Sequence, residues 1–208
     1  MNSFETDLKR ALCSVNFAVG FLLECAILWQ GGVESDLFQM SVPVLASVPY
    51  STAWIREYEH GFIKEYLPRC GRTSYIMGKF LACGISGGLL LAAAVFVCQG
   101  FGEGEDAAGN SVLFFFSGMF WAVVSAALAA AANSTYVAYG GAFVLYYMLI
   151  ILYERYFPSL YCLYPVEWYA PEHTWVFGDF GILLMIGGMT LLTGILYYEI
   201  LRRCMERV

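Results

Sequence analysis

The sequence predicts an all-α integral membrane protein, built as a single domain of six transmembrane helices over residues 1–208. Of its residues, 60% are hydrophobic and only 13% are charged, whereas about a quarter of a soluble domain is charged. Six segments are long and apolar enough to cross the roughly 30 Å hydrocarbon layer of a bilayer. The basic residues are also unevenly divided among the loops, as is typical of multi-pass membrane proteins.

The six predicted spans are separated mostly by short connections. They comprise residues 11–30, 37–54, 74–98, 110–132, 136–153 and 177–201. The second span is interrupted by Pro43 and Pro49, which membrane helices tolerate when neighbouring groups satisfy the freed backbone. The first is expected to be a span and not a cleaved signal peptide, because Glu5 and Asp7 precede it and no Ala-x-Ala-like site follows it.

The loop charges predict the orientation of these spans. With the N-terminus in the cytoplasm, every Lys and Arg except Arg155 falls on the cytoplasmic side, while the outer loops are acidic, as in "GEGED" at residues 102–106. Basic residues mark cytoplasmic loops, so we expect a plasma-membrane protein with both termini cytoplasmic. The small external loops favour a bacterial host. The net charge of −6 argues against a nucleic-acid partner, and membrane lipid is the expected surroundings.

Two further segments are expected at the membrane surface. The N-terminal stretch places Phe4, Leu8 and Leu12 on one side of a helix, which suits a helix lying flat at the cytoplasmic interface. Residues 154–176 lie between the fifth and sixth spans, are too polar to cross, and are rich in Tyr, Trp and Pro. Because such aromatic side chains settle at the interface, short re-entrant or interfacial helices are expected there.

The longest cytoplasmic connection joins the second and third spans. Its apolar side chains fall on one face of an amphipathic helix, comprising Ile55, Tyr58, Phe62 and Tyr66. Pro68 and Gly71 then break the helix. Two interpretations remain open for this segment, a solvated connector with snorkelling cations and a docking surface for a partner protein.

The spacing of this segment resembles the region after the second span in type-2 ABC transporter permeases. That family has a Glu-x-Glu-x-Gly run, then a Leu-Leu-x-x-Pro-x-x-Arg stretch, then an aromatic residue, a Gly and a Lys that open the third helix. The matching residues, in order, are Glu57, Glu59, Gly61, Arg72, Tyr75, Gly78 and Lys79. The chain departs from the pattern because Pro68 is displaced, the Gly-to-Lys interval is short and Phe62 replaces a Thr. The family also has an N-terminal elbow helix, and "YPVEW" at residues 164–168 loosely resembles its Asn-Pro-Leu-aromatic stretch.

The resemblance implies a transporter subunit that works with other chains. A separate ATPase, which would carry ATP and Mg²⁺, would dock on residues 55–72, and a second permease subunit, identical or different, would complete a dimer that exports its cargo. The implied docking residues are Glu57, Glu59, Gly61, Phe62, Tyr66, Arg69, Arg72 and Lys79. The sequence contains no Gly-x-x-x-x-Gly-Lys-Ser/Thr phosphate loop, so we expect this chain to hold no cofactor and to be no enzyme itself.

The cargo path is indicated by few residues. Glu24 lies inside the first span, where an ionisable residue is a functional candidate, although a purely structural glutamate is equally open. Phe115, Tyr139 and Tyr146 indicate an aromatic, nearly uncharged path for a hydrophobic or amphiphilic cargo such as a peptide, drug or lipid. The alternative, that these rings face lipid or the protein core, stays open.

Two other classes fit the sequence less well. The membrane subunits that bind substrates in small-molecule uptake systems carry an Ala-x-x-x-Ala pattern on the first span, whereas Ala11, Ala18 and Ala26 are spaced differently here. An intramembrane enzyme needs paired acids or a nucleophile beside His within the bilayer, and both histidines lie in loops. The seven cysteines show no metal-binding spacing, and pairing of Cys98 with Cys162 stays open.

Overall fold

The computed structural model describes residues 3–63, 71–100, 107–175 and 177–206. Over these ranges the chain forms eight α-helices and two short 3₁₀ helices, with no strand. Four α-helices are long and apolar enough to cross a membrane, namely α6 (Arg72–Gly100), α7 (Ala107–Ala132), α8 (Thr135–Arg155) and α9 (Asp179–Met205). Such lengths match the thickness of a bilayer and suggest a multi-pass membrane protein.

The first predicted span is the second half of a bent helix pair. Helix α1 (Ser3–Leu12) and helix α2 (Val15–Gly31) meet at an angle of 49° and count as a fifth candidate span if they are taken together. The Ser14 hydroxyl accepts a hydrogen bond from the amide of Phe17 at 3.0 Å, which caps the start of α2. The expected N-terminal helix is therefore present as a separate element.

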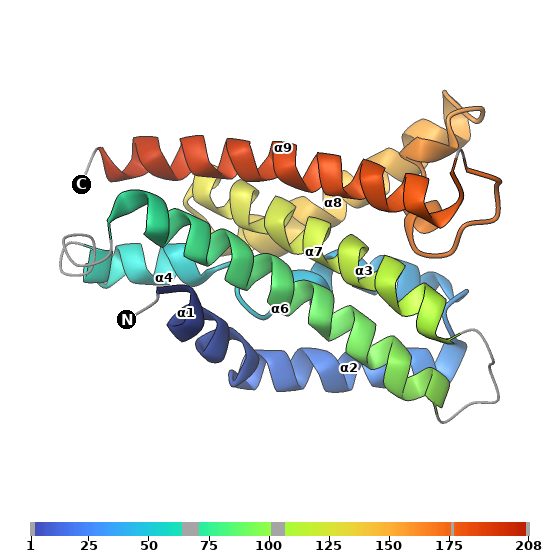
Figure 1. Ribbon diagram of the computed structural model, residues 1–208, viewed down its shortest axis with the longest axis horizontal. Coiled ribbons are helices and arrows are strands. Elements are labelled where there is room, and N and C mark those ends of the chain that lie inside the picture. The colour runs from blue at the N-terminus through green and yellow to red at the C-terminus, as the bar shows by residue number, and fades with distance from the viewer. Residues whose placement is uncertain (1–2, 64–70, 101–106, 176, 207–208) are drawn as a thin grey trace.

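The second predicted span, residues 37–54, is not one continuous helix, and the prediction is wrong in this respect. Helix α3 (Asp36–Ser47) ends before a run of turns over residues 48–52, and the short helix α4 (Ala53–Glu59) follows. Pro43 is accommodated inside α3, whereas Pro49, which has no amide hydrogen to donate, lies in the break. Figure 1 shows α3 and α4 toward opposite ends of the protein, joined by this connection.

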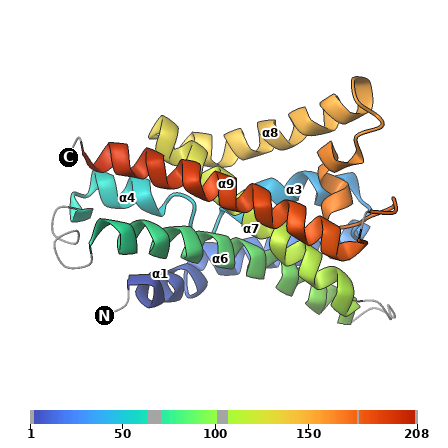
Figure 2. The same cartoon turned by 45° about the horizontal axis from the view of Figure 1, so that its top comes forward.

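Helix α7 lies at the centre of the helical bundle. In its apolar 18-residue stretch, 72% of the residues are buried, against 17% in the corresponding stretch of α8 and 22% in that of α9. Helices α8 and α9 are therefore outer helices (Figure 2). Glycines allow α6 to approach α7 and α3 closely. A methyl group at Gly87 would lie 2.5 Å from the Ala122 side chain and 2.6 Å from the carbonyl oxygen of Ala46, so a larger residue would separate these helices.

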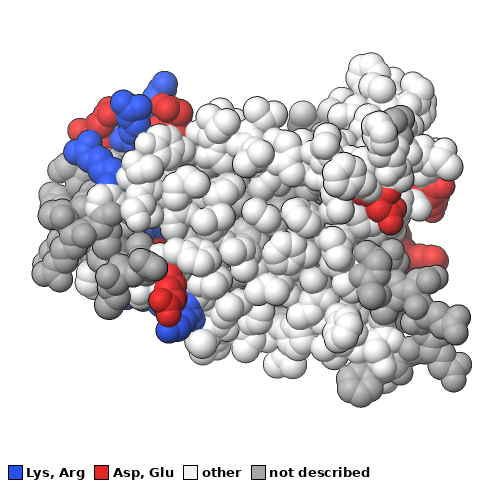
Figure 3. Space-filling view, in the orientation of Figure 1, with Lys and Arg blue, Asp and Glu red and all other residues white. Residues whose placement is uncertain are grey.

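The two ends of the protein differ in charge. Both termini lie at one end, together with α4 and the start of α6 (Figure 1). In the face seen in Figure 3, Lys and Arg gather at this end together with some acidic residues, whereas acidic residues without basic ones mark the other. We call them the basic end and the acidic end. The loop between α8 and α9 lies at the acidic end and contains the two 3₁₀ helices η1 (Tyr161–Leu163) and η2 (Pro165–Trp168), so short helices occur where they were expected.

Candidate functional site

A buried lysine at the basic end organises a cluster of polar side chains. Lys79 of α6 is only 1% exposed, and its ammonium lies 2.8 Å from Glu57 Oε1 and 3.8 Å from Asp7 Oδ1. It also donates to the Tyr50 hydroxyl at 3.3 Å. Because an unpaired charge in a protein interior costs several kcal/mol, these partners are what allow a lysine to be buried at this position.

Two tyrosines complete this cluster. The Tyr50 hydroxyl donates to Asp7 Oδ1 at 2.7 Å, and the Tyr75 hydroxyl donates to Glu57 Oε2. The Lys79 ammonium lies 5.2 Å from the centre of the Tyr50 ring and 5.0 Å from that of Tyr75, within the range of cation–π attraction. We call these five residues the Lys79 cluster. Both carboxylates therefore have a hydroxyl donor in addition to the ammonium.

The Lys79 cluster joins four parts of the chain. Asp7 comes from α1, Tyr50 from the connection before α4, Glu57 from α4, and Tyr75 and Lys79 from α6. Tyr75 and Lys79 are one helical turn apart, so they lie on the same face of α6. The charged side chains thus connect α1, α4 and α6 through interactions that are strongest away from water.

The predicted docking residues fall into three groups. Glu57 and Lys79 meet in the Lys79 cluster, as described above. Four others lie on the surface of the basic end, where Glu59, Gly61, Phe62 and Arg72 are exposed. Gly61 has a φ of +70°, which glycine adopts readily and which turns the chain after α4. Tyr66 and Arg69 lie outside the described residues.

Sequence reasoning missed Asp7 and Tyr50 as members of the cluster. Asp7 is buried, whereas the neighbouring Lys9 and Glu5 are exposed and pair with each other at 3.0 Å. One signal for such partners was available, because a lysine within a predicted span requires a buried acid. The sequence did not indicate which acid this would be, since Asp7 and Lys79 are 72 positions apart in the chain.

The residues predicted to line a cargo path lie in different parts of the protein. Tyr146 is fully buried and packs edge-on against Trp121 at 5.2 Å. Tyr139 packs against the apolar core at the basic end, while Tyr146 belongs to the other half of the core. Phe115 lies on α7 beside Gly88 of α6. A shared path for these residues stays a prediction.

Glu24, the remaining residue of that prediction, is buried between α2 and α3. The Ser41 hydroxyl lies 3.1 and 3.3 Å from its two carboxyl oxygens. The same hydroxyl is 2.7 Å from the carbonyl oxygen of Phe38. Glu24 forms no ion pair within the described part of the chain, so its interior setting is less polar than that of the Lys79 cluster.

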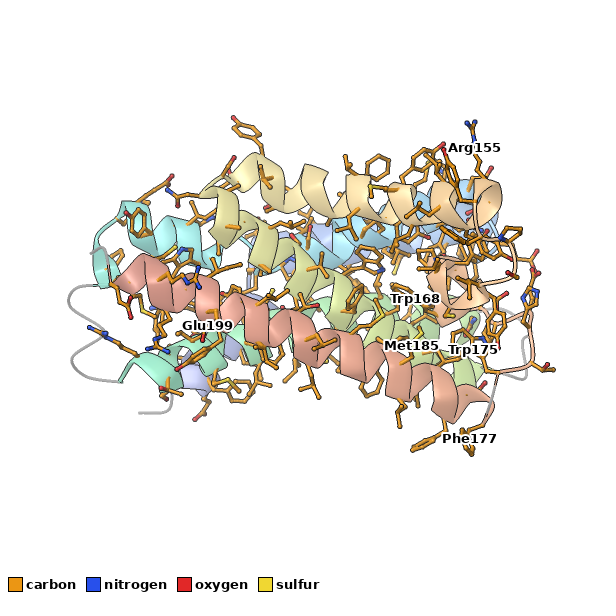
Figure 4. The ribbon with its side chains drawn as sticks, turned by 90° about the horizontal axis from the view of Figure 1, so that it is seen from above. Arg155, Trp168, Trp175, Phe177, Met185 and Glu199 are labelled. Carbon is orange, nitrogen blue, oxygen red and sulfur yellow. The ribbon has the colours of Figure 1, made fainter. Side chains whose placement is uncertain are left out.

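Another buried carboxylate organises the loop at the acidic end. Glu167 is 2% exposed, and its Oε2 accepts from the backbone amides of Glu172 at 3.2 Å and His173 at 3.3 Å. Its Oε1 lies 2.7 Å from His173 Nδ1. Such a set of donors holds the loop in one conformation. Figure 4 shows Trp168 and Trp175 of this loop near the acidic end of the bundle.

Aromatic side chains attach this loop to the bundle. Trp168 stacks on Trp121 of α7, with ring centres 5.9 Å apart, and its indole N–H donates to the carbonyl oxygen of Cys162 at 3.0 Å. The Tyr169 and Tyr146 hydroxyls are 3.3 Å apart. Burial raises the pKa of Tyr169 well above its ordinary value, so this phenol stays neutral. The loop is therefore part of the packed core.

The described residues form neither a metal-binding group nor a disulfide between Cys98 and Cys162. Among the residues described, no group of three or more His, Cys, Asp or Glu side chains could hold a metal ion. Cys98 and Cys162 are both free thiols.

Comparisons with protein-family models, with curated proteins and with solved structures find no match to this chain.

Proposed function

We propose that this chain is the transmembrane subunit of an ATP-driven exporter, of the type-2 ABC permease kind, with a separate ATPase docking at the basic end. The observation that carries the proposal is the Lys79 cluster. A docking helix transmits a push to the spans only if it is fixed to them, and rigid-body switching depends on such fixed contacts. Buried ion pairs connect α4 to both α1 and α6, as this role requires.

The exposed face of α4 and the turn after it suit a protein partner. Phe62 is 59% exposed and Tyr58 40% exposed, and Arg56, Glu59 and His60 are exposed beside them. Aromatic side chains supply contact area, and neighbouring charges of both signs fix the orientation of a partner. This combination supports docking over a merely solvated connector.

In the proposed arrangement the chain crosses the membrane six times. Helices α3 and α4 together form a broken second crossing, and α1 lies at the inner surface. Lys and Arg at the basic end support a cytoplasmic location for both termini by the positive-inside rule. The weakly buried helices α8 and α9 would face lipid or a second permease subunit. The mainly aromatic and aliphatic interior supports a hydrophobic or amphiphilic cargo.

The test is retention of an ATPase by the purified chain. We would co-express the protein with the proteins encoded by its neighbouring genes, test whether an ATPase is retained, and compare wild type with Glu59→Arg/Phe62→Arg. The matched control is Glu154→Arg/Phe157→Arg, which makes the same exchanges at exposed positions of the acidic end. The docking variant should lower ATPase retention at least about tenfold, since loss of a central aromatic anchor typically costs that much.

Two results would contradict the proposal. If the wild type retains no ATPase, the transporter assignment fails, and the uptake-type binding subunit fails with it because it too requires an ATPase. If the docking variant retains ATPase as well as the acidic-end control does, an ATPase binds this chain elsewhere and the role of α4 is wrong.

A further inference from the structure

A pocket of about 200 Å³ opens at the basic end between α1 and α4. Its lining comes from α1, from the corner between α1 and α2, from the connection before α4, and from α4 itself. The polar side chains among them are Arg10, Ser14, Asn16, Tyr50, Thr52, Arg56 and Glu57. The pocket is next to the Lys79 cluster and shares Tyr50 and Glu57 with it.

The charges around this pocket leave an excess of positive charge. Glu57, the acidic residue among its described lining residues, is already bound by the Lys79 ammonium at 2.8 Å. Arg10 lies 3.8 Å from the same carboxylate oxygen, and Arg56 forms no ion pair with any residue in the described ranges. Three cations, Arg10, Arg56 and Lys79, thus face two carboxylates, Asp7 and Glu57. The forked guanidinium groups match the oxygens of a phosphate.

A threonine hydroxyl in the pocket makes no hydrogen bond within the described part of the chain. Thr52 is only 3% exposed and precedes α4, yet its side chain makes no capping hydrogen bond and no other hydrogen bond to the described residues. Thr52 lines this pocket, and its hydroxyl can donate to an oxygen atom there. A ligand oxygen would satisfy it. The hydroxyl and the two guanidinium groups therefore favour the same kind of ligand, an oxyanion.

The surroundings of the pocket indicate where this oxyanion comes from. Ser14 and Asn16 lie at the start of α2 and line the pocket. Val15, between them, is 77% exposed, and Val19, one helical turn further along, is 48% exposed. The apolar surface of α2 thus starts at the edge of the pocket. A phospholipid places its phosphate beside its acyl chains and would satisfy both surfaces, whereas free phosphate satisfies only the pocket. Anionic lipids are attracted to basic sites at the cytoplasmic surface.

We propose that the pocket between α1 and α4 binds the phosphate group of an anionic phospholipid, with Arg10, Arg56 and the Thr52 hydroxyl as its ligands. The bound lipid would link α1 to α4 outside the Lys79 cluster. This proposal requires only that the protein lies in a membrane, and it holds whether or not the chain is a transporter subunit.

The test is lipid binding by the purified full chain in non-ionic detergent, measured by native mass spectrometry. The probes are phosphatidylglycerol and phosphatidylcholine added in equal amounts. The wild type should retain phosphatidylglycerol selectively, and Arg10→Gln/Arg56→Gln should lower its affinity about tenfold or more, as expected when charge-assisted bonds are lost. The control Arg202→Gln/Arg203→Gln removes the same charge from exposed positions at the same end and should retain selectivity.

Two finer variants test the hydroxyl group and the guanidinium shape in the pocket while its net charge is kept. Thr52→Val keeps the side-chain shape and should weaken phosphatidylglycerol binding several-fold without changing the melting temperature, since no capping bond is lost. Arg10→Lys/Arg56→Lys keeps the charge but not the fork and should bind more weakly than wild type. It also replaces the glutamine variant if that variant fails to fold.

Several results would overturn the proposal. Equal loss of selectivity in the Arg10/Arg56 and Arg202/Arg203 variants would show general attraction to a basic surface. Equal retention of both lipids by the wild type would exclude an anionic lipid site. If inorganic phosphate binds through Arg10 and Arg56 while phosphatidylglycerol shows no preference, the ligand is a free phosphate compound and the assignment to lipid is wrong.

Discussion

Replacing Lys79 with methionine is the most informative perturbation of the Lys79 cluster. Methionine has a similar length and fills the same space, so the change removes the charge with little change in packing. It leaves Asp7 and Glu57 without their shared ammonium, although the Glu57 side chain is 20% exposed and has Arg10 nearby, whereas that of Asp7 is only 5% exposed. The cost is therefore expected to come mainly from Asp7.

The expected loss is about 3 kcal/mol, at the lower end of the range for breaking a buried ion pair. The low end applies because the Tyr50 hydroxyl still donates to Asp7 and because water reaches Glu57. Adding Asp7→Asn to Lys79→Met should recover about 1 kcal/mol, since the buried carboxylate that has lost its ammonium partner is then removed. The two substitutions should thus be non-additive.

The assay is equilibrium unfolding in mixed detergent micelles, followed by tryptophan fluorescence. The matched control is Lys9→Met, which removes the exposed pair with Glu5 and should cost about 0.5 kcal/mol or less. Two results would contradict this account. If Lys79→Met and the Lys9→Met control have the same free energy of unfolding, or if the effects of the Lys79 and Asp7 substitutions are additive, the cluster does not hold α1 to α6.

Three further predictions concern the rest of the bundle. Glu167→Gln should speed amide hydrogen exchange at the two backbone amides it binds by about tenfold, as expected for losing a charged acceptor; unchanged exchange would show that the loop is held by its aromatic residues alone. Tyr146→Phe should cost about 1–3 kcal/mol of unfolding free energy because the buried Tyr169 hydroxyl loses its partner, and a neutral result would contradict that bond. Gly87→Ala should destabilise by about 1–3 kcal/mol through overpacking, measured in the same unfolding assay. Gly187→Ala, where nothing lies within 4 Å of the added methyl group, should be neutral or slightly stabilising, and equal effects at the two glycines would refute the close approach of α6 to its neighbours.

The sequence predicted the long helices well because each depends on local composition. An apolar stretch of sufficient length forms a helix in a membrane regardless of its neighbours, and α6, α7, α8 and α9 follow from this rule. The break between α3 and α4 was harder to predict. Proline is tolerated in some membrane helices and ends others, and the tertiary surroundings decide: Pro43 lies inside α3, whereas Pro49 lies in the break.

The candidate site was predictable only in part. Glu57 and Lys79 were both identified, but from motif spacing, and their direct contact follows from the packing of α4 against α6. Identifying Asp7 and Tyr50 required knowledge of how α1 packs against α6, which no local pattern contains. In the same way, the burial of Glu167 could not be predicted, because an acidic residue in a polar loop is normally solvated and here several donors surround it.

The measurement that tests the central claim most directly is the coupling of ATP hydrolysis to cargo in the complex with the co-expressed ATPase. We would compare wild type with Glu57→Gln in lipid nanodiscs, across a panel of hydrophobic peptides, drugs and lipids, after showing that both bind the ATPase equally. The account predicts that Glu57→Gln hydrolyses ATP but loses most of the stimulation by cargo, because α4 is no longer firmly held by Lys79. Full cargo stimulation in this variant would show that the Lys79 cluster stabilises the fold without transmitting movement from α4.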